Sequence, residues 1–186
     1  KQLAATGQSL MQSQRLAKSV TQALLGKEQA FSELSDSASV LGRNVRALTQ
    51  GDVEMGVQSV DSSFKEELTT VGSLAQRAEK NANAVSGQKA VLTQAGDALR
   101  TINRQSSSLL ELAEAVANTK LQVASSTAEI AASSQLLMLT QRIGKSANEF
   151  QTMDGVSPEA VFLLGRDLNS FKELAEGLLN GSAELR

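Results

Sequence analysis

The chain has 186 residues, of which 41% are hydrophobic and only 3% aromatic, so its core cannot be built on large rings. There are 18 basic and 20 acidic residues, and the net charge of −2 argues against nucleic acid or an anionic membrane surface as a partner. Without histidine or cysteine, the chain lacks the usual general base, thiolate chemistry and the commonest metal ligands. We therefore predict no enzymatic activity, no metal site and no cofactor.

An internal repeat organises the chain. The stretch QSLMQSQRLAKS at residues 8–19 returns 127 positions later as QLLMLTQRIGKS at residues 135–146, with seven of the twelve positions identical. A second block follows each copy, as LGRNV at residues 41–45 and as LGRDL at residues 164–168. Such a repeat indicates two related modules in tandem. We place them at residues 1–120 and 121–186.

Heptad-like spacing predicts helices throughout the first module. The seam of the first helix, which ends at Gly26, is Leu3, Gly7, Leu10, Gln14, Ala17, Thr21 and Leu24. The seam of the second helix, which stops near Gly51, is Phe31, Leu34, Ala38, Leu41, Val45 and Leu48. A third helix begins near Asp61 or Ser62, either of which suits an N-cap. Its seam is Phe64, Leu68, Val71, Ala75, Ala78, Ala82 and Val85.

The following segment, residues 88–151, keeps the heptad steps without a proline, which predicts one very long helix. Its middle seam is Ala113, Val116, Lys120, Val123, Thr127, Ile130 and Ser134. Because the second motif copy lies on the same segment, we expect the fourth helix of module one to continue as the first helix of module two.

The last helix has the strongest start signal, Ser157 as N-cap followed by Pro158 and Glu159. Its seam is Val161, Leu164, Leu168, Phe171, Ala175 and Leu178. The predicted fold is all-α, with two stacked four-helix-bundle modules in tandem that share the long helix. We expect the second module to be incomplete in this chain, since it holds only the first two helices of its bundle.

The motif places polar side chains at helical spacing. Residues three and four positions apart share a helix face, so Met11, Arg15 and Lys18 form one stripe and their repeats form another. The glutamines fall on the predicted seam, where a polar residue usually specifies register or partner. Either the polar groups link helices within the bundle, or two arginines of a symmetric dimer converge on an anion. Spacing alone favours the first reading. The candidate ligand, partner or dimer-interface residues are Gln14, Arg15, Lys18, Gln141, Arg142 and Lys145.

The motif SQRLAK at residues 13–18 and its repeat TQRIGK at residues 140–145, each followed by a Leu-Gly-Arg helix, resemble the PilJ-type sensor module. This family comprises extracytoplasmic four-helix bundles of nitrate/nitrite sensor kinases and of some bacterial chemoreceptors. Two modules in tandem are similar to the methyl-accepting receptors that control type IV pili and twitching motility. The resemblance covers most of the chain through the repeat and helix order, and its specific signal lies in the two motifs.

One departure from the family pattern concerns the ligand. Nitrate-binding relatives carry an additional arginine just before the motif methionine, whereas this chain has Leu10 and Leu137 at those positions. We therefore expect no nitrate sensing, although Arg15 and Arg142 match the later arginine of the motif.

The resemblance implies a periplasmic sensory domain of a bacterial inner-membrane receptor, in which a partner shifts the packing of the helices. It suggests a protein partner, the type IV pilin, and a homodimer in the full receptor. Contact with the membrane would come only through transmembrane helices absent from this chain. The alternatives are a passive coiled-coil spacer or scaffold and a nitrate-type sensor of small anions.

Overall fold

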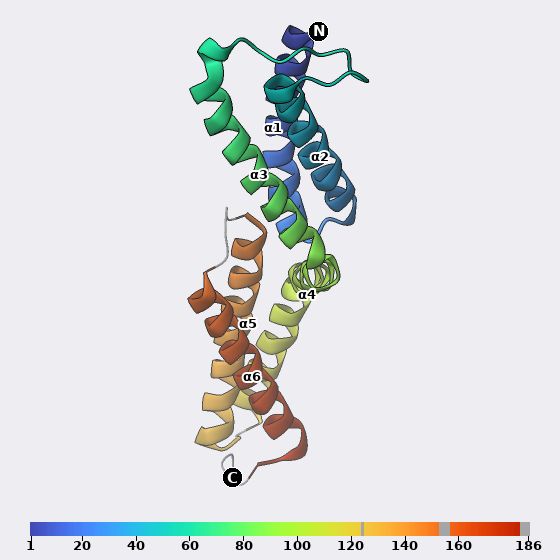
Figure 1. Ribbon diagram of the computed structural model, residues 1–186. Coiled ribbons are helices and arrows are strands. Elements are labelled where there is room, and N and C mark those ends of the chain that lie inside the picture. The colour runs from blue at the N-terminus through green and yellow to red at the C-terminus, as the bar shows by residue number, and fades with distance from the viewer. Residues whose placement is uncertain (124, 153–156, 183–186) are drawn as a thin grey trace. The chain divides into compact units, whose positions relative to one another are not determined.

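A computed structural model gives the fold and describes residues 1–123, 125–152 and 157–182. Of the residues that the structure describes, 88% are helical, which confirms the predicted all-α class. Figure 1 shows the elements α1 (Gln2–Leu24), α2 (Glu28–Gln50), η1 (Ser62–Phe64), α3 (Lys65–Gly87), α4 (Lys89–Gln122), α5 (Thr127–Thr152) and α6 (Pro158–Asn180).

The chain divides into two compact units, Lys1–Gly96 and Asp97–Arg186, which we call unit 1 and unit 2. Unit 1 holds α1, α2, α3 and the first residues of α4, and unit 2 holds the rest of α4 with α5 and α6. The predicted modules, residues 1–120 and 121–186, follow the sequence repeat. That boundary stays a prediction, because it rests on the repeat alone.

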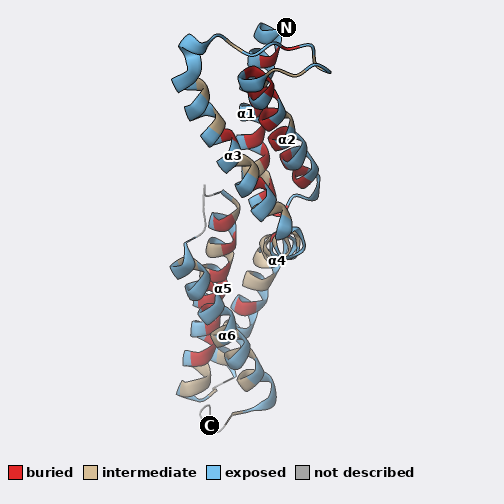
Figure 2. Cartoon of the chain, in the orientation of Figure 1, coloured by how far each residue is buried: buried red, intermediate tan, exposed pale blue. Residues whose placement is uncertain are grey.

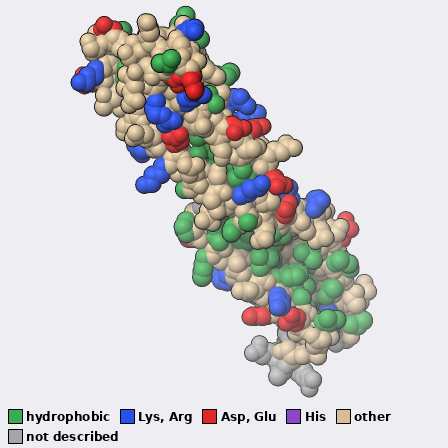
Figure 3. All heavy atoms as spheres, turned by 45° about the vertical axis from the view of Figure 1, so that its right-hand side comes forward, with side chains coloured by type: hydrophobic (Ala, Val, Ile, Leu, Met, Phe, Trp, Pro, Cys, Tyr) green, Lys and Arg blue, Asp and Glu red, His purple; other side chains and the backbone are tan. Residues whose placement is uncertain are grey.

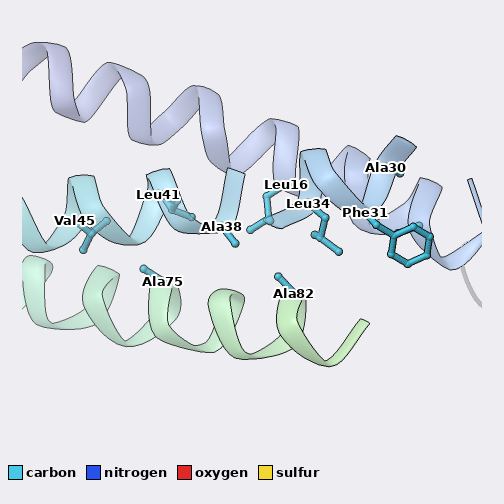
Figure 4. Close-up of a cluster of buried hydrophobic side chains, with 10 residues drawn as sticks. Leu16, Ala30, Phe31, Leu34, Ala38, Leu41, Val45, Ala75 and Ala82 are labelled. Carbon is cyan, nitrogen blue, oxygen red and sulfur yellow. The ribbon is translucent and has the colours of Figure 1, made fainter. Parts of the chain in front are cut away.

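The core of unit 1 lies between α1, α2 and α3, and Figure 4 shows it in close-up. Leu34 at its centre is fully buried, and burying such a side chain contributes roughly 1.5–3 kcal/mol. The predicted seam of the second helix is confirmed, since all six of its residues are buried in α2. Figure 2 shows that the buried stretches of unit 1 lie mainly on α1 and α2.

α3 covers α2 through a narrow stripe of small residues. Ala75 and Ala82 are buried, whereas Phe64 and Val71 of the predicted seam are exposed. α3 packs mainly on α2 and only slightly on α1, so it buries fewer positions than a helix in a closed bundle. Asp61 caps the short helix η1 that leads into α3, because its carboxylate accepts a hydrogen bond from the Ser63 amide at 2.9 Å. The N-cap of α3 itself is Phe64, which makes no side-chain cap, so the prediction holds for η1 and not for α3.

The single long helix predicted for residues 88–151 is wrong, since α4 ends at Gln122 and α5 begins at Thr127. The physical reason is a capping box. The Ser126 hydroxyl accepts from the Glu129 amide at 3.2 Å, and the Glu129 carboxylate accepts from the Ser126 amide, also at 3.2 Å. These two bonds satisfy amides that a helix start leaves free, and they begin a new helix here.

Unit 2 is an antiparallel arrangement of α4, α5 and α6. Its core consists of Ile143, Phe150 and Leu164, with Leu99, Ile102, Ala160 and Phe171 packed around them. The predicted start of the last helix is confirmed, because the Ser157 hydroxyl accepts from the Ala160 amide at 3.1 Å and Pro158 follows. Two members of that helix's predicted seam, Val161 and Leu168, are exposed.

Candidate functional site: the two motif copies

The first motif copy lies in α1, and its three candidate side chains face away from the core. Gln14, Arg15 and Lys18 are all exposed. Within the described ranges, none of the three has a hydrogen-bond or ion-pair partner. The first copy therefore presents an amide and two cations to whatever contacts this face.

The face of α1 that packs in unit 1 is not the predicted seam. The seam residues are exposed, with Leu3 at 86% and Leu10 at 65% exposed. The buried residues are mostly small: Ala5, Gln12, Leu16, Ser19 and Ala23. Small side chains let α1 and α2 approach closely, so the larger apolar side chains remain outside. The predicted place of Gln14 on a packed seam is therefore wrong within this chain.

Two positions of the motif are buried in both copies. Gln12 and Leu16 of α1 correspond to Leu139 and Ile143 of α5, and all four are buried in their own unit. The buried residues of α5 are Ala132, Ser133, Leu136, Leu139, Thr140, Ile143, Ala147 and Phe150. Gln141 is exposed like Gln14, so its predicted seam position is wrong too. The two copies thus share part of a packing face, but Thr140 is buried on α5 whereas its counterpart Ser13 is exposed on α1.

The second copy differs from the first because its arginine has a partner within the chain. Arg142 Nη2 donates to Asp167 Oδ1 at 2.9 Å, and the Asp167 side chain is only 5% exposed. Arg166 Nη2 lies 3.7 Å from the same oxygen. Lys145 and Glu149 form a longer ion pair at 3.7 Å, in which both side chains are largely exposed. For Arg142, the geometry therefore favours the helix-linking reading of the motif.

The two helix hairpins have different registers. In unit 1, Asn44 Nδ2 donates to Gln8 Oε1 at 3.2 Å. Their repeat counterparts are Asp167 and Gln135. In unit 2, Asp167 instead pairs with Arg142, which lies seven residues beyond Gln135 on α5. A shift of seven residues is two helical turns, so it keeps the same faces together while changing which side chains meet.

Asp167 is the residue that the sequence analysis missed. It lies one position before Leu168 of the predicted seam and three after Leu164. A single carboxylate on an otherwise apolar stripe requires a partner, because a buried charge is costly unless it is paired. The exchange of Asn44 in the first copy for Asp167 in the second was the available signal. The register that selects Arg142 as partner was not readable from the repeat.

A groove of about 340 Å³ lies between α2 and α3 in unit 1. Gly42 and Gly72 leave room in its walls, and Arg46 and Glu79 form an ion pair at 3.3 Å along its rim. A Cβ on Gly42 would meet the Glu79 carboxylate at 2.9 Å, so glycine allows this ion pair to lie flat on α2. None of the six candidate residues lines this groove.

The comparison with known families agrees with the motif. Residues 1–101, which include all of unit 1, match the PilJ family, described as the type IV pili methyl-accepting chemotaxis transducer N-terminal domain. The chain belongs to this family. The first motif copy lies inside the matched range of the PilJ family, and the second copy lies beyond it.

PilJ-family domains belong to membrane-bound chemoreceptors and are in general non-enzymatic. No curated protein matches this chain. Among its described helices, none is long and apolar enough to cross a membrane. In the same residues, no group of three or more carboxylates is placed to hold a metal ion.

Proposed function

We propose that this chain is the periplasmic sensory part of a transmembrane chemoreceptor that controls twitching motility by type IV pili. The family match supports a chemoreceptor domain, and the composition supports a binding function rather than a catalytic one. The observation that carries the proposal is the state of the first motif: Gln14, Arg15 and Lys18 lie exposed and unpaired on α1 within the described residues.

The outer face of α1 fits a second copy of the chain. Its residues keep heptad steps, as a helix does when it packs against a parallel partner. Leu3, Leu10 and Leu24 on this face are 86%, 65% and 51% exposed, and Gly7 and Ala17 between them permit close approach. Gln14 lies in the middle of the stripe, where a polar residue fixes the register of a helix pair. This face therefore supports a homodimer with α1 at its axis.

Arg15 and Lys18 lie beside this stripe and supply two positive charges. Arginine pairs with carboxylates through two parallel hydrogen bonds, so an acidic protein surface suits these side chains. We take the partner to be the type IV pilin subunit. A partner that binds one packing state of the helices more tightly shifts the population toward that state, and the signal is a small helix displacement.

The test is a calorimetric titration of the chain with the soluble part of the pilin, with nitrate as the comparison ligand. The variant R15E/K18E reverses the two motif charges. The matched control is R77E/K80E, because Arg77 and Lys80 have the same spacing on α3 and are equally exposed. We expect heat with pilin for the wild type and the control, and at least a tenfold weaker affinity for R15E/K18E.

Other outcomes contradict the proposal in different ways. Heat with nitrate that disappears in R15E/K18E makes the chain a sensor of small anions, with Arg15 in place of the arginine missing at Leu10. No heat with either ligand leaves the passive spacer as the better reading. Equal loss of pilin binding in both variants shows that general charge, and not the motif, attracts the partner.

A further inference from the structure

The groove between α2 and α3 in unit 1 has an apolar floor and a polar rim. Val45 and Ala75 in its lining are buried, and Leu68 is partly buried. The side chains around them include hydroxyls and amides, namely those of Thr49, Gln50, Thr69, Ser73 and Gln76. The volume of about 340 Å³ lies within the range of small-molecule sites, roughly 300–1,000 Å³. The groove therefore has the size and the lining of a site for a small ligand.

Gly72 lines this groove from the interior of α3, and packing within the described residues does not explain it. A Cβ built on Gly72 would meet no atom of a neighbouring element within 4 Å. Glycine inside a helix is less favourable than alanine, because it loses more conformational freedom on folding. Glycine is also the residue that lets a ligand approach the backbone closely. The open space beside Gly72 therefore favours an occupant that is not part of unit 1.

Two opposite charges meet at the rim of the groove. Arg46 Nη1 donates to Glu79 Oε2 at 3.3 Å, which is longer than the about 2.7–2.9 Å of a strong charge-assisted hydrogen bond. The Arg46 side chain is 56% exposed and the Glu79 side chain is 30% exposed. Such ion pairs contribute little to stability, because water competes for both charges and two long side chains lose freedom. A ligand can therefore separate the two side chains at small cost.

Gly42 determines where this ion pair lies. A Cβ on Gly42 would meet Glu79 Oε1 at 2.9 Å and Arg46 Nη1 at 3.1 Å. The guanidinium and the carboxylate thus rest side by side on the backbone of α2. A ligand that binds both groups needs a negative and a positive charge that lie equally close together.

An α-amino acid meets this requirement, because its carboxylate and its ammonium group are bonded to the same carbon atom. The guanidinium of arginine binds a carboxylate through two parallel hydrogen bonds, and the carboxylate of glutamate accepts from an ammonium group. On the face that Figure 3 shows, Lys and Arg side chains are interspersed with Asp and Glu over unit 1, so no field of one sign favours a ligand with a net charge. The apolar floor suits an aliphatic side chain on the ligand.

We propose that the groove between α2 and α3 binds an aliphatic α-amino acid. Arg46 binds its carboxylate, Glu79 binds its ammonium group, and its side chain lies on the floor that includes Ala75. Gly72 leaves the room that the ligand needs. None of the six motif residues lines the groove, so this inference goes beyond the proposed function. Its test can fail while the pilin titration succeeds, and the reverse.

The test is a calorimetric titration of the full chain with L-leucine. Two analogues separate the charged groups of this ligand: 4-methylpentanoate lacks the ammonium group, and 3-methylbutylamine lacks the carboxylate. We expect saturable binding of L-leucine. Either analogue should bind at least tenfold more weakly, because it loses one of the two charge-assisted contacts.

Two variants assign each charge of the ligand to its partner. In E79Q, L-leucine should bind at least tenfold more weakly, whereas 4-methylpentanoate should bind at least as well as it binds to the wild type. In R46Q, L-leucine should again bind at least tenfold more weakly, whereas 3-methylbutylamine should keep its affinity. A merely structural role of the ion pair would instead lower the affinity for all three ligands alike.

The variant G72L tests the position of the site. The added side chain fills the groove, so binding of L-leucine should be lost. Urea denaturation should show no loss of stability, since leucine favours a helix more than glycine does. The matched control is A84L, which places the same side chain at an exposed position of α3 outside the groove and should bind L-leucine like the wild type.

Three results would overturn the inference. Absence of heat with millimolar L-leucine shows that the groove is not a site for aliphatic amino acids. Equal affinity for L-leucine and its two analogues shows that Arg46 and Glu79 do not select a zwitterion. Binding of L-leucine that survives in G72L places the ligand elsewhere on the chain.

Discussion

At the scale of single residues, Gln12 is a buried polar side chain of unit 1 that is not fully hydrogen-bonded. It is only 6% exposed, and its Oε1 has no hydrogen-bond partner among the described residues. A buried polar atom without a partner costs roughly 1–3 kcal/mol. The counterpart of Gln12 in the repeat is Leu139, which is 3% exposed in unit 2.

Replacing Gln12 by leucine should therefore stabilise unit 1 by about 1 kcal/mol, since it removes the orphan oxygen and fills the site with the side chain that α5 uses. Urea denaturation followed by circular dichroism measures the change. Gln14→Leu, two positions away on the exposed face, is the matched control and should change stability by no more than about 0.5 kcal/mol. A loss of stability in Q12L would mean that Gln12 has a polar partner after all.

The two motif arginines give a second prediction. Arg142→Ala leaves the buried carboxylate of Asp167 with only the longer contact to Arg166, and should cost about 1.5–3 kcal/mol. Arg15→Ala removes an exposed and unpaired side chain, and should stay within about 0.5 kcal/mol. Denaturation of the two variants side by side is the measurement. Similar losses would show that Arg15 also links helices.

At the scale of elements, the loop between α2 and α3 is stabilised by charged side chains. Asp52 Oδ1 accepts from the Met55 amide at 3.0 Å, and Arg43 Nε lies 3.3 Å from Asp52 Oδ2. Val57 inserts into a small core with Ala47 and Leu48. The backbone hydrogen bond from Met55, followed by the guanidinium of Arg43, holds the pKa of Asp52 below its ordinary value of 3.8.

This shift makes the loop sensitive to acid. A carboxyl group whose pKa is lowered by folding contributes stability that is complete above pH 3.8 and is lost as the pH falls through the lowered value. Hydrogen exchange of the Met55 amide, corrected for intrinsic rates, should therefore stay slow down to about pH 4 and become faster below it. In the control D52N the side-chain amide oxygen still accepts hydrogen bonds but does not titrate, so the increase in the exchange rate of the Met55 amide at low pH should disappear. A rise of equal size in D52N would assign it to another acid.

The packed face of a helix could be predicted from the sequence best where the large apolar residues are also the residues that pack. The seam of α2 was readable because its large residues, such as Phe31 and Leu34, are the ones that pack. On α1 the same rule chose the wrong face, because small residues such as Ala5 and Ser19 face α2. A hydrophobic stripe shows that a face packs, but does not show whether the partner belongs to the same chain.

The prediction of one continuous helix over residues 88–151 was wrong for a related reason. Periodicity is a property of many residues, and it outweighed a local signal of two, Ser126 and Glu129. The Ser-x-x-Glu signature of Ser126 and Glu129 inside the long segment marks the start of α5. The candidate residues themselves could be predicted from the repeat. The repeat does not show that Arg142 is paired while Arg15 is exposed, because this difference depends on the register of α5 and α6, which brings Asp167 to Arg142.

At the scale of the whole molecule, the first motif and the outer face of α1 belong together. Within the PilJ-family part of the chain, α1 packs its small residues inward and leaves a heptad stripe with three leucines outside. In our account that stripe pairs with a second copy, and the exposed cations beside it meet the partner. In the proposed mechanism, the signal is a shift of the helices at that dimer axis.

Disulfide cross-linking of single-cysteine variants tests this account most directly. Because the chain has no cysteine, L10C carries one thiol on the outer face of α1, and L74C is the matched control on α3, where Leu74 is 55% exposed. The account predicts rapid formation of a covalent dimer by L10C under mild oxidation and little by L74C at the same concentration. Absence of the L10C dimer, or equal cross-linking of both variants, would contradict the pairing of two chains through α1.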